Sequence, residues 1–177
     1  MKSKFLLHVC CGPCVVAVLQ ELAGQFDLTV FYYNPNIHPQ EEYTKREHQA
    51  QKICQELNIE FIEAKYQPED WFAWAKDYQN ESEGGERCKK CFAMRLEQTA
   101  KHASENGFNY FGSTLTSGRN KKADIINPLG IEMGEKYNVE FYQEDWKKKG
   151  RQETARKKCL ENSIYRQNYC GCVYSNL

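Results

Sequence analysis

The sequence lacks the motifs and segments that mark several common classes of protein. It contains neither Gly-x-Gly-x-x-Gly nor Gly-x-x-x-x-Gly-Lys-Ser/Thr, which argues against a dinucleotide-binding or P-loop nucleotide site. No apolar run approaches the roughly 18 residues that cross a membrane. The apolar run near Met1 is also too short for the core of a secretory signal peptide. We therefore expect a cytoplasmic protein that does not contact a membrane.

The formal net charge is zero, but the charged residues are unevenly distributed along the chain. Residues 39–86 contain 12 acidic and 5 basic side chains, whereas residues 87–158 contain 16 basic and 9 acidic ones. The basic stretch is either a set of solvated helix faces or a surface that binds a polyanion. Neighbouring Tyr and Trp residues favour the polyanion. Lys147 and Lys148 belong to this stretch and are therefore candidates for binding a polyanion.

Cysteine, in contrast, is abundant, with nine residues in a chain of 177. Only Cys54 and Cys159 stand apart, and both are interpreted as small buried apolar residues. The others form three tight groups, Cys10-Cys11-Gly12-Pro13-Cys14, Cys88-Lys89-Lys90-Cys91 and Cys170-Gly171-Cys172. In a cytoplasmic protein, thiols this close together favour a metal site, an iron–sulfur cluster or a dithiol couple over structural disulfides.

Each group leaves alternatives open. Cys11-Gly12-Pro13-Cys14 is identical to the thioredoxin dithiol, but the preceding Cys10 and the other two groups weaken a simple thioredoxin interpretation. Cys88 and Cys91, together with two thiolates of the first group, suffice for a [4Fe–4S] cluster or for tetrahedral zinc, and spacing alone does not separate the two. Cys170-Gly171-Cys172 is either a readily reduced redox pair or a pair of metal ligands.

Periodicity predicts an alternation of strands and helices. Strands are expected at residues 4–9, 28–33, 59–62, 108–112 and 139–142, and helices at 13–24, 39–57, 68–78, 88–105, 121–136 and 151–163. This order is typical of βαβ units with a mainly parallel sheet. We expect residues 1–177 to form a single Rossmann-like α/β domain, with helices on both faces of the sheet and an irregular, cysteine-containing C-terminal tail.

Polar, turn-rich segments follow every predicted strand. The first strand leads into the Cys10–Cys14 group, and the second leads into Asn34, Asn36 and His38. Ligands of parallel sheets bind beyond the carboxyl ends of the strands, so these segments predict a functional site at one edge of the sheet. His38, in a proline-rich turn, is as readily explained by a structural role.

These motifs resemble the QueH-type epoxyqueuosine reductases, in the same order from residue 6 to about residue 175. The resemblance rests on Leu7–Cys14, Tyr33–Pro39 with Glu42, Tyr43 and Arg46, Arg87-Cys88-x-x-Cys91, Asp145–Lys147, and Tyr165–Cys172. It implies that the chain is an oxidoreductase that converts epoxyqueuosine to queuosine at the wobble position of tRNA, the last step of queuosine biosynthesis.

The resemblance also implies a set of site residues. A [4Fe–4S] cluster is expected on Cys10, Cys11, Cys88 and Cys91, with Cys170 and Cys172 as the redox-active pair. The resemblance is also compatible with an additional iron beside the cluster, and it leaves open whether Cys14 or an aspartate would ligate it. We expect tRNA to contact Asn34, Asn36, His38, Lys147, Lys148 and Arg166, and an external donor to supply electrons. The rival interpretations are a zinc-stabilised RNA-binding module and a small-molecule thiol oxidoreductase.

Overall fold

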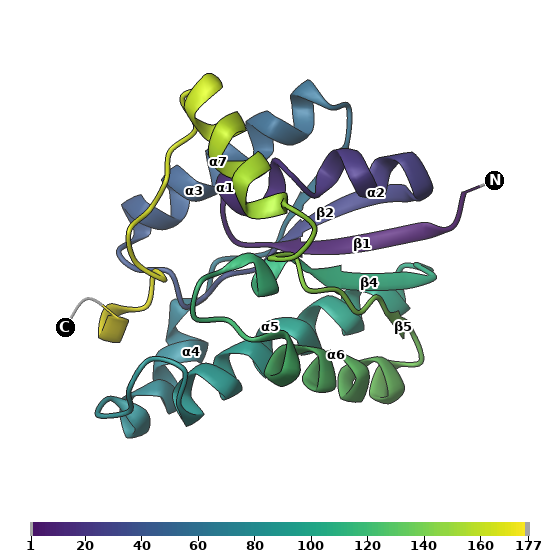
Figure 1. Ribbon diagram of the computed structural model, residues 1–177. Helices are drawn as coiled ribbons and strands as arrows, with labels where there is room; N and C mark the ends of the chain where they lie inside the picture. Colours follow the sequence, from purple (N-terminus) through teal and green to yellow (C-terminus); the bar gives the residue numbers. More distant parts are fainter. Residues whose placement is uncertain (1, 176–177) are drawn as a thin grey trace.

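The computed structural model describes residues 2–175, which are built around a five-stranded parallel sheet (Figure 1). Its strands are β1 (Lys4–Val9), β2 (Asp27–Tyr32), β3 (Glu60–Glu63), β4 (Tyr110–Ser113) and β5 (Glu140–Phe141). They lie in the order β3-β2-β1-β4-β5 and every pair is parallel. The connections reverse direction beside β1, as in a Rossmann-like sheet, so the predicted fold class is confirmed.

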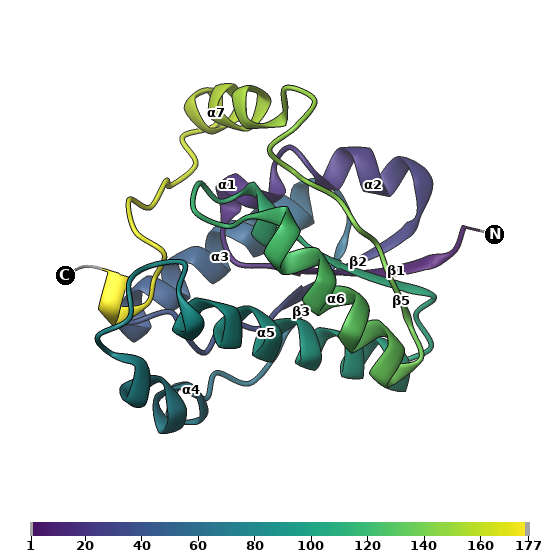
Figure 2. The ribbon, with the colours of Figure 1, turned by 60° about the horizontal axis from the view of Figure 1, so that its bottom comes forward.

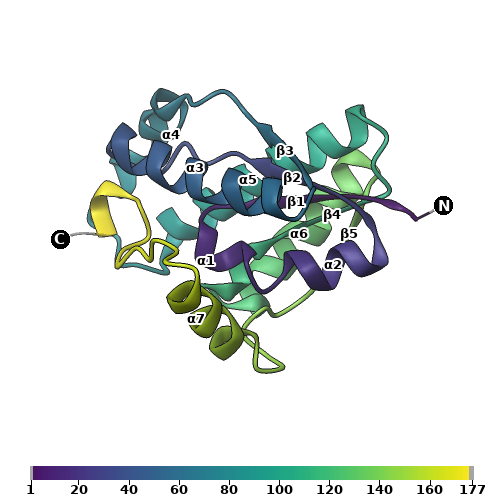
Figure 3. The same cartoon turned by 90° about the horizontal axis from the view of Figure 1, so that it is seen from above.

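Helices cover both faces of this sheet. Figures 1 and 3 show α1 (Gly12–Val15), α2 (Leu19–Gln25), α3 (Gln40–Glu56) and α7 (Arg151–Glu161) on one side. Figure 1 places α4 (Pro68–Ala75), α5 (Glu86–Glu105) and α6 (Ala123–Tyr137) on the other. The central strand supplies both cores, because its side chains alternate in direction. Leu7 and Val9 pack with Val30 on the first side, while Leu6 packs with Phe111 on the second.

One expected element is divided in two. The helix predicted over residues 13–24 is interrupted between α1 and α2, where the Val18 amide donates to the Val15 carbonyl at 2.9 Å and closes a tight turn. Val16 and Val18 occupy this turn, and β-branched side chains favour helix less than straight ones do. The other predicted elements are present with boundaries shifted by a few residues, and the helix expected over 68–78 ends as the 3₁₀ helix Lys76–Tyr78.

The C-terminal segment is irregular, as predicted, apart from the 3₁₀ helix Val173–Ser175. Figures 1 and 2 show this segment leaving α7 and running toward α4, at the end of the molecule opposite the N-terminus. Since β1 starts near the N-terminus, the tail lies at the carboxyl edge of the sheet. Within residues 2–175, every helix is too short or too polar to cross a lipid bilayer.

Candidate cysteine site at the carboxyl edge of the sheet

A cleft of about 1020 Å³ opens where the strands end. Segments that follow β1, β4 and β5 line it together with the C-terminal tail, whereas Asn34, Asn36 and His38, which follow β2, are not part of its lining. Cys10, Cys14 and Cys170 reach the cleft surface. The cleft therefore joins the first and third cysteine groups, which are separated by most of the chain.

The first group folds into a compact cluster of sulfur atoms. The Cys10 Sγ lies 3.9 Å from both the Cys11 Sγ and the Cys14 Sγ, and Cys11 and Cys14 form a disulfide. Pro13 suits the first turn of α1, where a backbone N–H is not needed. A Cβ at Gly12 would lie 2.7 Å from the Gln49 Cγ, so glycine allows α1 to pack against α3. Cys11 can ligate a metal only after this disulfide is reduced.

The second group lies in the first turns of α5. The Gly84 amide donates to the Cys88 Sγ at 3.2 Å, and Cys91 packs in a buried cluster with Trp71, Ala75 and Cys172. The second and third groups therefore meet through Cys91 and Cys172. In the described part of the chain, the group of three or more candidate ligands whose atoms all lie within 4.8 Å of one another is Cys10, Cys11 and Cys14, so Cys88 and Cys91 stand outside that triad.

A buried arginine lies within electrostatic range of cysteines from all three groups. Arg95 is 1% exposed, and its Nε donates to the Cys91 carbonyl at 3.1 Å. Burial alone would lower the pKa of Arg95, but the thiolates of its four cysteine neighbours outweigh this and raise it. These neighbours are Cys91, Cys170, Cys10 and Cys88. The Arg95 guanidinium is thus a positive charge shared by thiols from every group.

The two cysteines of the tail differ in their environment. Both are free thiols, Cys170 partly exposed at the cleft and Cys172 buried. Burial alone would raise the pKa of Cys170, but the nearby cations, led by Lys121 and Arg95, bring it below its usual value. Burial raises the pKa of Cys172 to about 11, and the charges of neighbouring cysteines add to this. Cys170 is therefore the thiol that ionises first.

The residues after β2 are more buried than a simple substrate-binding surface would be. The Asn34 Nδ2 donates to the Val9 carbonyl at 2.8 Å, which ties two strand ends together. The His38 amide donates to the Gly171 carbonyl at 2.8 Å. Asn36 is 1% exposed, and neither polar atom of its side chain has a partner among residues 2–175. Substrate binding by these three residues stays a prediction. Asn36 differs from Asn34 in that both polar atoms of its side chain are unpaired within residues 2–175.

The predicted basic residues are divided between the cleft and its surroundings. Arg166 lines the cleft, whereas Lys147 donates to the Lys121 carbonyl at 2.6 Å and Lys148 lies 3.8 Å from the Asp145 carboxylate. The cleft wall instead carries Arg119, Lys121, Arg156 and Arg166, whose side chains make no ion pair with any described residue. Sequence clustering identified the basic stretch but not which of its members face the cleft.

A family profile described as epoxyqueuosine reductase QueH matches residues 5–177. The chain belongs to the epoxyqueuosine reductase QueH family. It is thus an oxidoreductase of queuosine biosynthesis, as predicted.

Individual relatives agree with the profile. The epoxyqueuosine reductase QueH of Staphylococcus epidermidis is 40% identical over an alignment 182 residues long, gaps included. The alignment covers 98% of this chain and 76% of that one. The enzyme of the same name from Thermotoga maritima is 35% identical over 175 residues, which cover 97% of this chain and 90% of that one. The predicted match along nearly the whole chain is confirmed.

Solved structures with a similar fold are much more distant in sequence. The U34-tRNA thiolase NcsA from Methanococcus maripaludis, solved with its [4Fe-4S] cluster, has a TM-score of 0.65 at 15% identity, covering 99% of this chain and 62% of that one. A predicted subunit of a tRNA methyltransferase from Methanocaldococcus jannaschii has a TM-score of 0.59 at 10% identity, covering 88% and 75%. At such identities the likeness extends to the fold alone.

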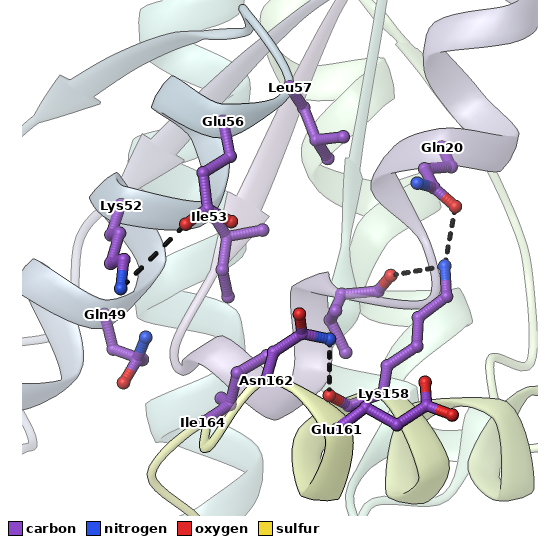
Figure 4. Close-up of a pocket in the computed structure, with 11 residues that line it drawn as sticks. Gln20, Gln49, Lys52, Ile53, Glu56, Leu57, Lys158, Glu161, Asn162 and Ile164 are labelled. Atoms are coloured by element: carbon purple, nitrogen blue, oxygen red, sulfur yellow. Dashed lines mark hydrogen bonds and ion pairs between the residues drawn. The ribbon is translucent and has the colours of Figure 1, made fainter.

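A second, smaller cavity lies apart from the cysteines of this QueH family member. It has a volume of about 240 Å³ and is lined by α3, α7 and the segment from Val16 to Gln20 (Figure 4). The Lys158 Nζ spans it by donating to the Gln20 Oε1 at 2.6 Å. Its lining includes no cysteine, so it is separate from the redox site.

Proposed function

We propose that this chain reduces the epoxide of epoxyqueuosine at the wobble position of tRNA, giving the alkene of queuosine in the last step of that pathway. The observation that best supports the proposal is that cysteines of the first and third groups line one large cleft with basic walls, while Cys91 of the second group packs with Cys172. The thiols supply redox chemistry, and the cleft is large enough to receive a nucleobase with its side arm. We expect the reaction to take place in the cytoplasm.

Cys10, Cys11, Cys88 and Cys91 are proposed to hold a [4Fe–4S] cluster. Cysteine thiolates are the usual ligands of such clusters. The Arg95 Nη2 is buried and has no hydrogen-bond acceptor among residues 2–175, and thiolate-ligated sulfur would provide one. The buried positive charge also offsets the negative charge of such a centre.

When bound, the cluster would transfer single electrons. Ligation by Cys11 requires the Cys11–Cys14 disulfide to be reduced. Cys14 then becomes a free thiol 3.9 Å from the Cys10 Sγ, where it is a candidate ligand for an additional iron.

Cys170 and Cys172 are proposed to supply the reducing equivalents. Removal of the epoxide oxygen as water requires two electrons and two protons, and two thiols that become one disulfide provide both. Cys170 faces the cleft and has the lower pKa, so its thiolate is the first to react, while Cys172 retains its proton for longer. An external electron donor must then return two electrons and two protons to the disulfide.

The tRNA is proposed to lie over the cleft. Arg119, Lys121, Arg156 and Arg166 line the wall and are free to contact phosphates, with Lys147 and Lys148 beside them. Such contacts position the RNA without reading its sequence. Asn34, Asn36 and His38, which follow β2 at the same edge of the sheet, are the proposed contacts of the modified base.

The proposed function is tested by anaerobic turnover of tRNA that carries epoxyqueuosine, with the nucleosides analysed by mass spectrometry. We expect conversion to queuosine by the iron-loaded protein with a chemical reductant, and none when Cys170 and Cys172 are both replaced by Ser. A colourless, zinc-containing protein that binds tRNA without converting it would contradict the proposal. Turnover of a free small-molecule disulfide, with no affinity for tRNA, would contradict it as well.

A further inference from the structure

The C-terminal cysteine pair is held by a buried arginine of α3. Arg46 is 1% exposed, and its Nη1 donates to the Cys170 carbonyl at 2.9 Å while its Nη2 lies 3.3 Å from the Tyr169 carbonyl. The remaining guanidinium nitrogen, Nε, donates to Glu42 at 2.6 Å. One planar side chain thus binds two successive carbonyls that directly precede Gly171. This fork geometry is specific to arginine.

The acidic partner of Arg46 is itself oriented by the tail. The Tyr165 hydroxyl lies 3.1 Å from each carboxylate oxygen of Glu42, and the Arg46 guanidinium lies 5.0 Å from the centre of the Tyr169 ring. The Arg46 guanidinium is therefore surrounded by groups from both α3 and the tail. Leaving its charge buried without these partners would be unfavourable, so the arrangement forms or breaks as a unit.

A second set of bonds holds the same turn from the loop before α3. The His38 amide donates to the Gly171 carbonyl at 2.8 Å, and the Tyr169 hydroxyl donates to the His38 carbonyl at 2.7 Å. Gly171 has a φ of +109°, and a Cβ there would lie 2.9 Å from the Ile37 Cγ1. Glycine is required both for this backbone conformation and for the close approach to Ile37.

We propose that Arg46 is a positioning residue that fixes the Cys170-Gly171-Cys172 turn against residues 37–39, so that both thiols are presented to the cysteine site in one defined arrangement. The importance of this arrangement for turnover rests on the proposed function of the pair. Without Arg46 the carbonyls of Tyr169 and Cys170 have no charged donor, and the tail has no regular secondary structure at these positions to replace it. The turn then moves away from Cys91 and from the cleft.

Three variants separate positioning from charge. Arg46→Met removes the charge and the donors but keeps much of the volume, whereas Arg46→Lys keeps the charge but cannot bind Glu42 and both carbonyls together. Lys52→Met is the matched control, because Lys52 is an exposed cation of the same helix. Gly171→Ala displaces the same turn without changing the residue at position 46, and its new Cβ would press on both the Ile37 Cγ1 and the Arg46 Nη1. Far-UV circular dichroism and iron content confirm that each variant is folded and loaded.

Two measurements report the position of the turn without depending on activity. The first is hydrogen exchange of the His38 amide, which the Gly171 carbonyl protects. The second is alkylation of Cys172, which is 8% exposed. Because hydrogen bonds from a charged donor are strong, we expect about tenfold or greater acceleration of both in Arg46→Met and in Gly171→Ala. Lys52→Met should match the wild type.

Steady-state kinetics then show how the position of the Cys170-Gly171-Cys172 turn affects turnover. In Arg46→Lys we expect the KM for tRNA to stay near the wild-type value, because the charge is retained, while kcat falls about tenfold as the turn shifts. Restoration of kcat by lysine would mean that Arg46 acts only as a cation. Unchanged His38 exchange and Cys172 alkylation in Arg46→Met would overturn the proposal.

The outcomes also separate this inference from the proposed function. If Cys170→Ser turns over normally, the pair has no redox role, yet exchange and alkylation still decide whether Arg46 holds the turn. If Cys170→Ser is inactive while Arg46→Met displaces the turn and keeps full kcat, the pair is needed but its position is not. The positioning role of Arg46 is then wrong.

Discussion

The cysteine groups at the two ends of the chain reach the same cleft by different physical means. Cys10 directly follows β1, which pairs with β2 on one side and β4 on the other, so the backbone of the sheet sets its position. Cys170 lies in an irregular segment and is held through Arg46, 124 residues away along the chain. The first group is thus part of the scaffold, and the second depends on a few side-chain contacts. Damage to the two groups should therefore have different consequences.

The largest effect is expected when a proposed cluster ligand is removed. Cys91→Ala or Cys88→Ala should lose iron, visible absorption and turnover together, because a four-cysteine cluster seldom survives the loss of a ligand. Iron analysis per chain and an absorption spectrum of anaerobically purified protein measure this. Cys54→Ala, at an isolated buried cysteine, is the control and should keep its iron. Full iron and activity in a Cys88 or Cys91 variant would remove that residue from the site.

Breaking the tail pair should separate turnover from iron content. Cys170→Ser or Cys172→Ser is expected to keep iron and the visible spectrum but to lose turnover by on the order of 100-fold or more, because a single thiol cannot form the internal disulfide. In the wild type, mild oxidation should protect both thiols from labelling together. Loss of iron in both variants, without oxidation-dependent protection, would show that the pair ligates metal instead.

Neutralising the cleft wall should weaken tRNA binding while the cluster stays intact. Changing Arg119, Lys121, Arg156 and Arg166 together to Gln is expected to lower affinity and to reduce the salt slope by about 0.7 to 0.9 for each phosphate that the protein no longer neutralises. The triple change of Lys147, Lys148 and Lys149 to Ala should have a smaller effect in the same direction, since these lysines already contact Lys121, Asp145 and Glu144. Binding titrations at several salt concentrations compare the two sets. An equal or larger effect of the triple change would place the RNA beside the cleft.

The two tail thiols should differ in how pH affects their alkylation. Cys170 has a pKa below its usual value, whereas that of Cys172 is about 11. The thiolate is the reactive form, so Cys170 should react faster at every pH below about 11, with the two rates converging only above it. Mass spectrometry of the alkylated peptides measures both rates in one sample. Preferential labelling of Cys172 at neutral pH would reverse the proposed order of reaction.

The smallest effect is expected in β1, the strand that carries the first cysteine group, and it is an effect of pH on folding stability. His8 is fully buried beside Ser113 and Tyr33, and its pKa is lowered from 6.5 to about 3, mainly by burial and further by Arg95. Below pH 6.5 the unfolded chain binds a proton that the folded chain rejects, so stability falls as the pH decreases toward 3. The loss at pH 5.5 should be about 1.4 kcal/mol. Denaturant unfolding at several pH values should show a weaker dependence in His8→Gln than in the wild type.

The sequence predicted the elements near the centre of the sheet better than the contacts between distant segments. Alternating apolar strands and the polar residues after them were enough to predict the parallel sheet and the edge that carries the site. The division of the helix over 13–24 was missed, because the tight turn at Val15–Val18 carries neither glycine nor proline. The Cys11–Cys14 disulfide was weighed only as a thioredoxin-like dithiol. The cluster ligands and the single-domain organisation of residues 1–177 stay predictions.

The sequence did contain a signal that Arg46 is buried and paired, but this signal was ambiguous. It falls at helical spacing from Tyr43 and Ala50, on the face of α3 that packs into the core, where an arginine is unusual. Its position indicates a buried partner, but the sequence does not say that the partner is the carbonyl of Cys170. Arg95 is similar, since its helix spacing does not reveal that the charges of cysteines from three separate segments act on it.

The sequence by itself determined the family and the alternation of strands and helices, because these follow from local patterns of residue type and spacing. Tertiary structure alone decided which cysteines meet, which thiol has the lower pKa and which cations line the cleft. These properties depend on distances between segments far apart in the chain and on burial. The contacts of Arg46 with the Cys170–Cys172 turn form only when the tail folds back onto the edge of the sheet.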